Sequence, residues 1–407
     1  MGKIAKRIFI VLVIVFVGLG SFYLGLQSGG ISDNYAYTDD KTENFLFNEE
    51  KLNNIENKLR AIDSIIDKKF LYDYEQKQLE EGIYKGYLAS LNDIYTEYYT
   101  QEEFKALNEQ SEGSFGGVGI EVSGMDGQFI EVIAPIKGTP AAKAGIKAKD
   151  KIIKIDGQDF LAKDLNEAVK LMRGEPGQEV VLTIQRMVDD QAKTMDFKLV
   201  REIINVESVH YQMLEENIAY INISNFQAHT AEDFKAAYKE LKGQGADRLI
   251  LDLRNNPGGL LDVTLEIADF LLPQGNIMSV NYKDETQQNY KSDKDAQDLA
   301  MVTLINGGSA SASEVLSGAL KDYKRSIIIG EKSFGKGVVQ QVIPLGDDTG
   351  VKVTVAEYFS PNKNKIHGVG IKPDIEVKLD ESVKAIGVEA LSEDKQLQKA
   401  IEVIKTK

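Results

Sequence analysis

Met301-Val-Thr-Leu-Ile305, followed without a break by Asn306-Gly-Gly-Ser-Ala-Ser-Ala-Ser-Glu314, is the stretch that decides the fold of this 407-residue chain. The first part is mostly apolar and predicts a buried strand. The second part is small and polar, and it leads into a helical pattern from Ala312 to Tyr323. A buried strand that turns directly into a helix is typical of an α/β sheet, and the loop at its carboxyl end is where such sheets place functional side chains.

The same alternation of strand and helix continues on both sides of this stretch. Continuous apolar strands between helices indicate a sheet that is covered on both faces. The predicted strands are Ile218–Ile223, Leu249–Leu253 and Ile327–Ile329, the predicted helices are Ala231–Leu241 and Leu260–Leu272, and a β-rich part covers Val338–Phe359. We therefore expect an α/β core over residues 190–378, followed by a C-terminal segment over residues 379–407.

Residues 113–189 have a different sequence pattern, with short β-like runs between glycine turns. Gly116-Gly-Val-Gly-Ile-Glu-Val122 opens a strand, whereas a phosphate-binding loop would open a helix. The order of the strands and the helix Leu165–Met172 resembles a PDZ domain, inserted between the helical region and the core. A glycine-rich turn can aim backbone N–H groups at a peptide carboxylate, and a strand edge can pair with an extended peptide. The expected carboxylate-binding residues are Gly117, Val118, Gly119 and Ile120.

The N-terminus predicts a membrane anchor. Ile8–Leu26 carries no charge, is mostly apolar, and follows Lys3, Lys6 and Arg7. About 20 such residues span a bilayer as a helix, and the basic flank stays in the cytoplasm. A cleaved signal peptide is the alternative, but no Ala-x-Ala site follows. We expect a single-pass protein of the cell membrane, with residues 1–26 as tip and transmembrane helix, 27–44 as linker, and the catalytic part outside.

Residues 45–112 follow a helical pattern. Leu52, Ile55, Leu59 and Ile62 recur at three- and four-residue steps, which places them on one face of an amphipathic helix. A second such face follows near Ile83. This region is expected to form a helical cap or a dimerisation arm, so a homodimer is one open alternative.

Composition excludes several classes of function. The net charge is −15, and no basic stripe with aromatic residues is present, so nucleic acid is not an expected partner. The chain has no cysteine, which excludes disulfides and thiolate catalysis. Its three histidines, His210, His229 and His367, are far apart in the sequence, so no metal site is expected.

Ser311 is a candidate nucleophile because it lies at the predicted start of a helix. Free N–H groups and the helix dipole at such a position can stabilise a developing oxyanion. The alternative is structural, because Ser311-Ala-Ser-Glu314 also fits a capping box, in which Ser311 caps the helix and Glu314 reaches back. The residues alone do not decide between Ser309, Ser311 and Ser313.

Lys336 is a candidate general base, since it stands between two glycines shortly after an apolar strand. A lysine must be neutral to accept a proton, and burial can lower its pKa from about 10.4 by roughly 3 units. Gln340 follows four residues later, so in a regular strand or helix both side chains would share a face. Its amide oxygen could then accept a hydrogen bond from the lysine.

These motifs together resemble the carboxy-terminal processing peptidase family, also called tail-specific proteases. The matching segments are Asn-x-x-Ser-Ala-Ser-Ala-Ser-Glu at 306–314, Phe-Gly-Lys-Gly-x-Val-Gln at 334–340, and Asp-Leu-Arg-Asn-Asn-Pro-Gly-Gly at 252–259. The resemblance implies a serine endopeptidase without cofactor or metal, acting on proteins or peptides with an apolar C-terminus. It also implies the roles of nucleophile for Ser311, base for Lys336, orienting amide for Gln340, and oxyanion hole for the N–H groups of Gly259 and Ala312.

Two other functions are alternatives to this one. A catalytically silent PDZ scaffold would not require Ser311 together with Lys336. A Ser-His hydrolase that uses His229 or His367 would be expected to carry a Gly-x-Ser-x-Gly elbow, which does not surround Ser311.

Overall fold

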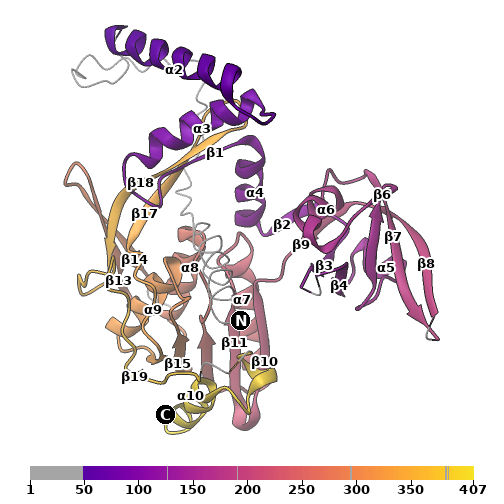
Figure 1. Ribbon diagram of the computed structural model, residues 1–407. Helices are drawn as coiled ribbons and strands as arrows, with labels where there is room; N and C mark the ends of the chain where they lie inside the picture. The colour runs from indigo at the N-terminus through magenta and orange to yellow at the C-terminus, as the bar shows by residue number, and fades with distance from the viewer. Residues whose placement is uncertain (1–48, 126, 190, 294–295, 381–382, 384) are drawn as a thin grey trace.

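The computed structural model describes residues 49–407, except 126, 190, 294–295, 381–382 and 384. It has an α/β core, a helical arm with a long β-hairpin, and a module that projects to one side (Figure 1). The expected anchor and linker, residues 1–26 and 27–44, lie outside the described residues. Within the described ranges, no helix combines the length and the apolar character that a membrane span requires.

The central sheet has the strand order β10-β11-β12-β15-β16-β19. All neighbours are parallel except β10 and β11, which are antiparallel. The strands are β10 (Val209–Met213), β11 (Ile218–Ile223), β12 (Arg248–Asp252), β15 (Ala300–Ile305), β16 (Ile327–Gly330) and β19 (Ile375–Glu376). The predicted strands over 218–223, 249–253, 301–305 and 327–329 are therefore confirmed to within a residue.

Helices cover both faces of this sheet, as the continuous apolar strands predicted. One face packs on α7 (Thr230–Gly243), α8 (Leu261–Leu271) and α9 (Ala312–Asp322), and the other on α10 (Lys395–Ile404). Leu249 and Leu251 lie in the first cluster and Ile250 in the second, as strand alternation requires. The short turns η2 (Glu215–Asn217) and η3 (Val388–Ala390) complete this part. The C-terminal segment, for which no element was predicted, supplies η3 and α10.

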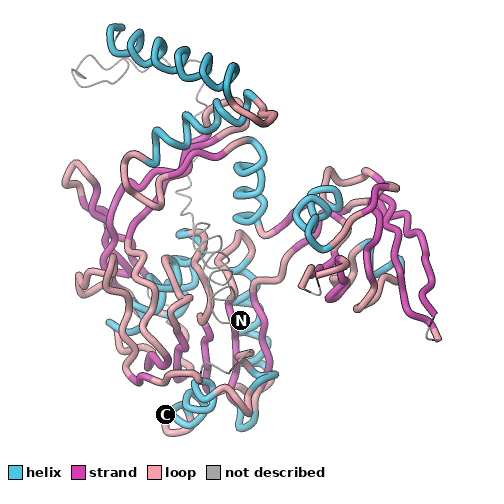
Figure 2. The backbone as a smooth tube through the Cα atoms, in the orientation of Figure 1, coloured by secondary structure: helices cyan, strands magenta, loops and turns pink. Residues whose placement is uncertain are grey.

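A second sheet rises from the core towards the helical arm. Its order is β1-β18-β13-β14, with β17 also paired to β18. The strands are β1 (Glu97–Tyr99), β13 (Gly275–Tyr282), β14 (Gln287–Ser292), β17 (Val338–Pro344) and β18 (Gly350–Phe359). The predicted β-rich part is therefore the β17–β18 hairpin, which extends to the arm (Figure 2).

The helical arm consists of α2 (Glu49–Lys69), α3 (Gln76–Ala89) and α4 (Gln101–Glu112). Thr100 and Glu103 form a capping box that starts α4, and Gly113 ends it with φ of 73°. The predicted apolar face of α2 is present but uncovered, since Leu52, Leu59 and Ile62 are 37–46% exposed.

The projecting module has the sheet order β3-β4-β5-β7-β8. Its elements are β3 (Ile120–Ser123), β4 (Ile130–Pro135), α5 (Pro140–Ala144), β5 (Lys151–Ile155), β6 (Gln158–Asp159), η1 (Ala162–Asp164), α6 (Leu165–Met172), β7 (Glu179–Val188) and β8 (Gln191–Val200). The expected end at residue 189 falls in the turn between β7 and β8, and the sheet continues to Val200.

The run Gly116–Val122 is split between two strands, which corrects the expected single strand. Gly116 and Gly117 belong to β2 (Ser114–Gly117), which pairs with β9 (Glu202–Asn205) and joins the module to the rest. Gly119 has φ of 75°, where a Cβ would lie 2.3 Å from that of Thr139, so only glycine fits between the strands.

Exposed ion pairs join this module to α4. Glu102, Lys105 and Glu109 recur along one side of α4 and face the module. Their partners are Lys170 at 2.8 Å, Glu175 at 2.7 Å and Arg173 at 3.2 Å. Each exposed pair contributes little free energy, so the orientation of the module is held by weak, salt-sensitive contacts.

Candidate active site

Ser311 lies between the end of β15 and the first residue of α9, as the sequence predicts. Its backbone has φ of 54° and ψ of −115°, a combination rarely adopted by a residue with a side chain. Such local strain is concentrated at functional sites, where the surroundings must enforce it. The side chain is fully buried.

The two neighbouring serines have structural hydrogen bonds. Ser309 Oγ donates to the carbonyl oxygen of Leu253 at 2.8 Å and accepts from the N–H of Asn306 at 3.0 Å. Ser313 Oγ donates to the carbonyl oxygen of Asn256 at 2.9 Å. Both hydroxyls therefore connect the loop of β15 to the loop of β12.

Ser311 differs from both, because its Oγ is buried and has no hydrogen-bond partner among the described residues. The capping interpretation is therefore only half right. Glu314 does reach back, and accepts from the backbone N–H of Ser311 at 3.0 Å. The Ser311 oxygen itself is available for chemistry.

Lys336 lies in the loop between β16 and β17 and is 1% exposed. Its Nζ is 4.8 Å from the centre of the Tyr95 ring. Burial, and then the charge of Lys352, lower the pKa of Lys336 to about 7, against the opposing effects of Glu97 and Glu314. A large fraction of Lys336 is therefore neutral near pH 7, as a general base requires.

Both glycines beside Lys336 are required by the loop. Gly335 has φ of 96°, and a Cβ on Gly337 would lie 2.2 Å from the backbone nitrogen of His367. The lysine is thus held in a tight turn against the segment around His367.

Glu314 joins the serine helix to the lysine loop. Its carboxylate accepts hydrogen bonds from the N–H groups of Ser311 at 3.0 Å, Lys336 at 2.8 Å and Gly335 at 2.7 Å, and from Ser333 Oγ at 2.5 Å. Burial raises the pKa of Glu314, and these four donors oppose that effect. The local sequence predicts Glu314 only as part of a helix cap, because its bonds to the 333–336 loop form only in the tertiary structure.

Tyr358 of β18 makes a second connection, which the sequence did not reveal. Its buried hydroxyl lies 3.0 Å from the carbonyl oxygen of Ser311 and also contacts the carbonyl oxygen of Lys336. The backbones of Ser311 and Lys336 are therefore tied together on two sides. The Ser311 hydroxyl and the Lys336 amine are not hydrogen-bonded to each other in this structure.

Gln340 is fully buried, but the expected hydrogen bond from Lys336 to its amide oxygen is absent, since Oε1 has no partner among the described residues. Its Nε2 lies 3.4 Å from both the Val338 carbonyl oxygen and Thr354 Oγ1. The four-residue spacing does not bring the two side chains together, because Lys336 precedes β17 and because the pairing register shifts between Val339 and Gln340.

The expected oxyanion residues lie beside Ser311. A Cβ on Gly258 would lie 2.8 Å from the Cβ of Ser311 and 3.0 Å from the nitrogen of Ala312. At Gly259, with φ of 145°, a Cβ would lie 2.1 Å from the Phe226 carbonyl oxygen. Within the described part of the chain, neither the Gly259 nor the Ala312 N–H donates a hydrogen bond.

Buried polar contacts hold the loop that carries these glycines. Asn256 donates to the carbonyl oxygen of Ile223 at 2.8 Å and accepts from the N–H of Gly258 at 2.8 Å. Arg254 forms buried ion pairs with Asp252 at 2.6 Å and with Asp394 at 2.8 Å. The C-terminal segment therefore helps to hold this loop in place through Asp394.

The expected carboxylate-binding residues lie in and between β2 and β3, and Figure 1 shows these strands apart from α9 and β17, which follow Ser311 and Lys336 in the chain. Gly117 ends β2, Val118 is buried between the strands, and Ile120 starts β3. The carbonyl oxygen of Gly119 accepts from the N–H of Ile136 at 3.0 Å. Because β3 is the edge of its sheet, one side of it remains open to pairing.

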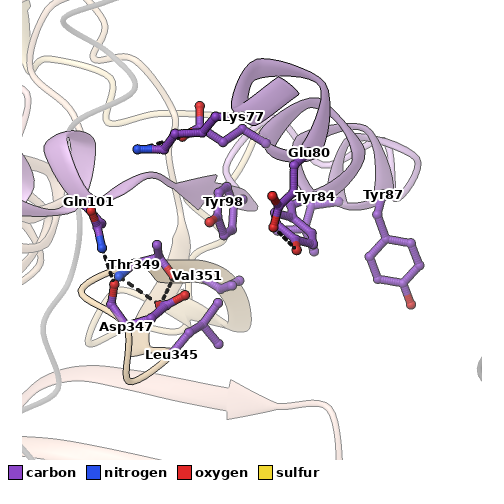
Figure 3. A pocket seen from close by; sticks show the side chains of 12 residues that line it. Lys77, Glu80, Tyr84, Tyr87, Tyr98, Gln101, Leu345, Asp347, Thr349 and Val351 are labelled. Atoms are coloured by element: carbon purple, nitrogen blue, oxygen red, sulfur yellow. Dashed lines mark hydrogen bonds and ion pairs between the residues drawn. The ribbon is translucent and has the colours of Figure 1, made fainter. Parts of the chain in front are cut away.

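A cavity of about 490 Å³ lies between α3 and the β17–β18 hairpin (Figure 3). Tyr84 and Tyr98 line it, with ring centres 5.1 Å apart. Along β1, Tyr98 alternates with Glu97 and Tyr99, so it points to the opposite face of the sheet. Neither Ser311 nor Lys336 lines this cavity.

Comparison with known proteins gives one consistent family. The sequence pattern of peptidase family S41 matches residues 217–377, and that of a PDZ domain matches residues 131–186. A carboxy-terminal-processing protease of Bartonella bacilliformis is 43% identical over 312 residues, covering 75% of this chain and 70% of that protein. The carboxy-terminal processing protease CtpA of Bacillus subtilis is 38% identical over 318 residues, covering 77% and 67%.

A solved structure of a protein from Bacteroides fragilis assigned to the S41 proteases aligns with 85% of this chain and 97% of its own. The TM-score is 0.53 and the identity 16%, so this likeness concerns the fold.

Proposed function

From the finding that the chain belongs to peptidase family S41, and is a serine-type C-terminal processing peptidase with a PDZ domain, we propose that Ser311 is its nucleophile and Lys336 its general base. The observation that carries this proposal is the contrast among the three serines. Ser309 and Ser313 use their hydroxyls in structural hydrogen bonds, whereas Ser311 has a strained backbone and an unbonded, buried hydroxyl.

The proposed reaction is acyl transfer. The neutral amine of Lys336 takes the proton of Ser311 Oγ, which attacks the carbonyl carbon of the substrate peptide. The N–H groups of Gly259 and Ala312 stabilise the oxyanion, and the protonated lysine then supplies a proton to the leaving amine. Water, deprotonated by the same amine, releases the acyl group from Ser311. A side-chain movement must first bring the amine to the hydroxyl, since the two are not bonded here.

Alanine substitution of each serine tests this assignment. Ser311→Ala should abolish cleavage while costing at most about 1 kcal/mol of stability, because the Ser311 hydroxyl makes no hydrogen bond that the change would remove. Ser309→Ala and Ser313→Ala should keep measurable cleavage but lose about 0.5–1.5 kcal/mol, because each removes one buried hydrogen bond to a carbonyl oxygen that keeps a backbone N–H donor. A folded Ser311→Ala protein that still cleaves would disprove the proposal.

The PDZ domain would select substrates by their C-terminal carboxylate, at Gly117–Ile120. The open edge of β3 supports this, because an extended peptide can add there as a further strand. The substrate residues next to this carboxylate would be apolar.

We further propose that residues 1–26 anchor the protein in the cell membrane, with the peptidase outside. The uncharged stretch Ile8–Leu26 and the preceding basic residues support this. Fractionation of cells tests it: the full chain should pellet with membranes after a carbonate wash, and a chain beginning at residue 45 should not.

A second copy is the partner that we propose for the helical arm. Leu59, Ile62 and Ile65 of α2 are 37–58% exposed, and Ile83 and Tyr87 of α3 are 47–50% exposed. Apolar patches of this kind mark association surfaces. Sedimentation of residues 45–407 should give a dimer, and Ile62→Glu should give a monomer.

A further inference from the structure

A half-buried ion pair lies on the sheet that borders Lys336. Lys352 of β18 is 1% exposed, and its Nζ is 2.8 Å from Glu97 Oε2 of β1. The same Nζ bonds to the hydroxyl of Tyr99. Glu97 and Lys352 are directly opposite each other in the antiparallel register, so their side chains project to the same face.

That face also carries residues of the proposed site. Thr354 follows Lys352 by two positions, and it pairs with Gln340 across the β17–β18 hairpin. Tyr95 precedes Glu97 by two positions, and its ring is the one that contacts the Lys336 amine. Through Tyr95, the Lys336 amine therefore lies against the chain segment that leads directly into β1, the strand that carries Glu97 and Tyr99.

Lysine is rarely buried to this extent, because an isolated buried ammonium is costly. Here the Lys352 amine donates hydrogen bonds to the Glu97 carboxylate and the Tyr99 hydroxyl. The proposed reaction, however, does not use Lys352. A buried lysine on the sheet that borders the proposed base therefore calls for a functional explanation.

We propose that Lys352, held by Glu97 and Tyr99, is a positioning residue of the reaction, whose fixed ammonium favours the neutral amine of Lys336. Like charges disfavour each other's ionised forms, as in pairs of lysines where one amine serves as a base or nucleophile. After burial, Lys352 is the largest cause of the lowered pKa of Lys336.

Other charged and titratable groups also face Lys336. These are Glu97 from β1, Glu314 from α9, and Asp93 from the turn before β1, all of which favour the protonated amine. Tyr95 and Tyr358 add phenol groups, and His367 packs against Tyr95 with ring centres 6.5 Å apart. Among the groups that shift the Lys336 pKa, Lys352 supplies the positive charge.

This inference gives the N-terminal region a role in chemistry. Residues 93–99 lie about 240 positions from Lys336 in sequence, yet they supply both the ring beside its amine and the carboxylate that fixes Lys352. The arm is therefore part of the pocket of the base as well as a cap.

The test is the pH profile of kcat/KM, which reports the pKa of the base in the free enzyme. The inference rests on the proposed Ser-Lys mechanism. Lys352→Met should move the acid limb upward by about 1 pH unit, because it removes the ammonium and leaves the Glu97 carboxylate unpaired. Lys352→Arg, which keeps the charge, should restore the limb to near its original position.

Two further variants control for folding and for general charge effects. The double variant Lys352→Met, Glu97→Gln removes both charges, and its limb should move upward by less than that of Lys352→Met. Lys365→Met removes a lysine that follows β18 and pairs with Glu357 of β18 at 3.1 Å. This variant should leave the acid limb of the pH profile unchanged.

A folded Lys352→Met enzyme with an unmoved acid limb, or a Lys352→Arg limb displaced as far as that of Lys352→Met, would overturn the inference. If Lys352→Met does not fold, the double variant decides, because an unmoved limb there is also contrary to the proposal. The activity of Lys336→Arg distinguishes a failure of the Ser-Lys mechanism from a failure of the role proposed for Lys352. If that variant is active, the base itself is wrongly assigned; if it is inactive and the limbs stay fixed, only the role of Lys352 fails.

Discussion

The carboxylate of Glu314 accepts a hydrogen bond of 2.8 Å from the backbone N–H of Lys336. Because Glu314 is the third residue of α9, the helix that starts after Ser311 also holds the loop of the proposed base. The backbones that carry the two reacting groups are therefore held together by a side chain that need not touch the substrate.

Glu314→Gln tests this connection. A neutral amide can accept through only one of its two ends, so at least one buried backbone N–H would face an NH₂ group. We expect a stability loss of about 1–3 kcal/mol and a fall in kcat of at least about tenfold, with a smaller change in KM. Glu357→Gln, at a half-buried residue of β18 that pairs with Lys365, is the control. A Glu314→Gln enzyme with unchanged kcat would show that the connection is dispensable.

Lys336→Arg should be inactive, because a guanidinium stays protonated and cannot accept the serine proton. Lys332→Arg, at an exposed position of the same loop, should leave activity unchanged. In the parent enzyme, kcat/KM should rise with pH through the lysine pKa, which burial lowers to about 7. Below that pH the amine is protonated and the rate should fall about tenfold per unit.

The histidines provide the contrasting case for the same experiment. A variant in which His210, His229 and His367 are all glutamine should keep substantial activity if it folds. His367 needs attention, since its Nδ1 is buried without a hydrogen-bond partner in the described structure. A folded triple variant without activity, or an active Lys336→Arg enzyme, would revive the Ser-His hypothesis.

The sequence predicted those parts of the fold in which local pattern and tertiary packing agree. The helix expected at Ala312–Tyr323 is α9, Ala312–Asp322, because an apolar strand and a capped helix start are both local signals. The choice among the three serines could not be made from sequence. It depends on which hydroxyls meet the carbonyl oxygens of Leu253 and Asn256, more than 50 positions away.

Two other failures have equally specific causes. β1 is only three residues long, and its partner Lys352 is 255 positions from Glu97, so no pattern in residues 97–99 predicted a strand. The expected bond from Lys336 to Gln340 assumed a regular strand, and the bulge before Gln340 removes that assumption.

Substrate tails should be discriminated by their terminal carboxylate. The intact enzyme should cleave a substrate with a free apolar tail faster than its amidated twin, in a direct competition. Gly119→Ala should reduce this preference, because its Cβ would lie 2.3 Å from that of Thr139 and displace the binding turn. Gly127→Ala is the matched control, since Gly127 also has positive φ but open space around it. Equal cleavage of both tails by the intact enzyme would refute carboxylate recognition.

Asp394→Asn should destabilise the protein, and the loss should depend on pH. Asp394 pairs with the buried Arg254, five residues before Gly259, and also caps α10 through the N–H of Leu397. Burial raises the pKa of Asp394, but the hydrogen bond and charge of Arg254 outweigh it and hold the pKa below its ordinary value.

A carboxyl with a lowered pKa in the folded state stabilises the protein above its unfolded pKa of about 3.9, and this stabilisation is lost as the pH falls through the folded value. Urea unfolding at pH 7 should therefore show a loss of about 2 kcal/mol for Asp394→Asn, and the difference should shrink below pH 4. Asp380→Asn, in the exposed pair with Lys395 of the same segment, should change stability by less than about 0.5 kcal/mol at either pH. A loss of equal size at pH 7 and pH 3 would mean that Asp394 acts through packing and the helix cap, without a contribution from its charge.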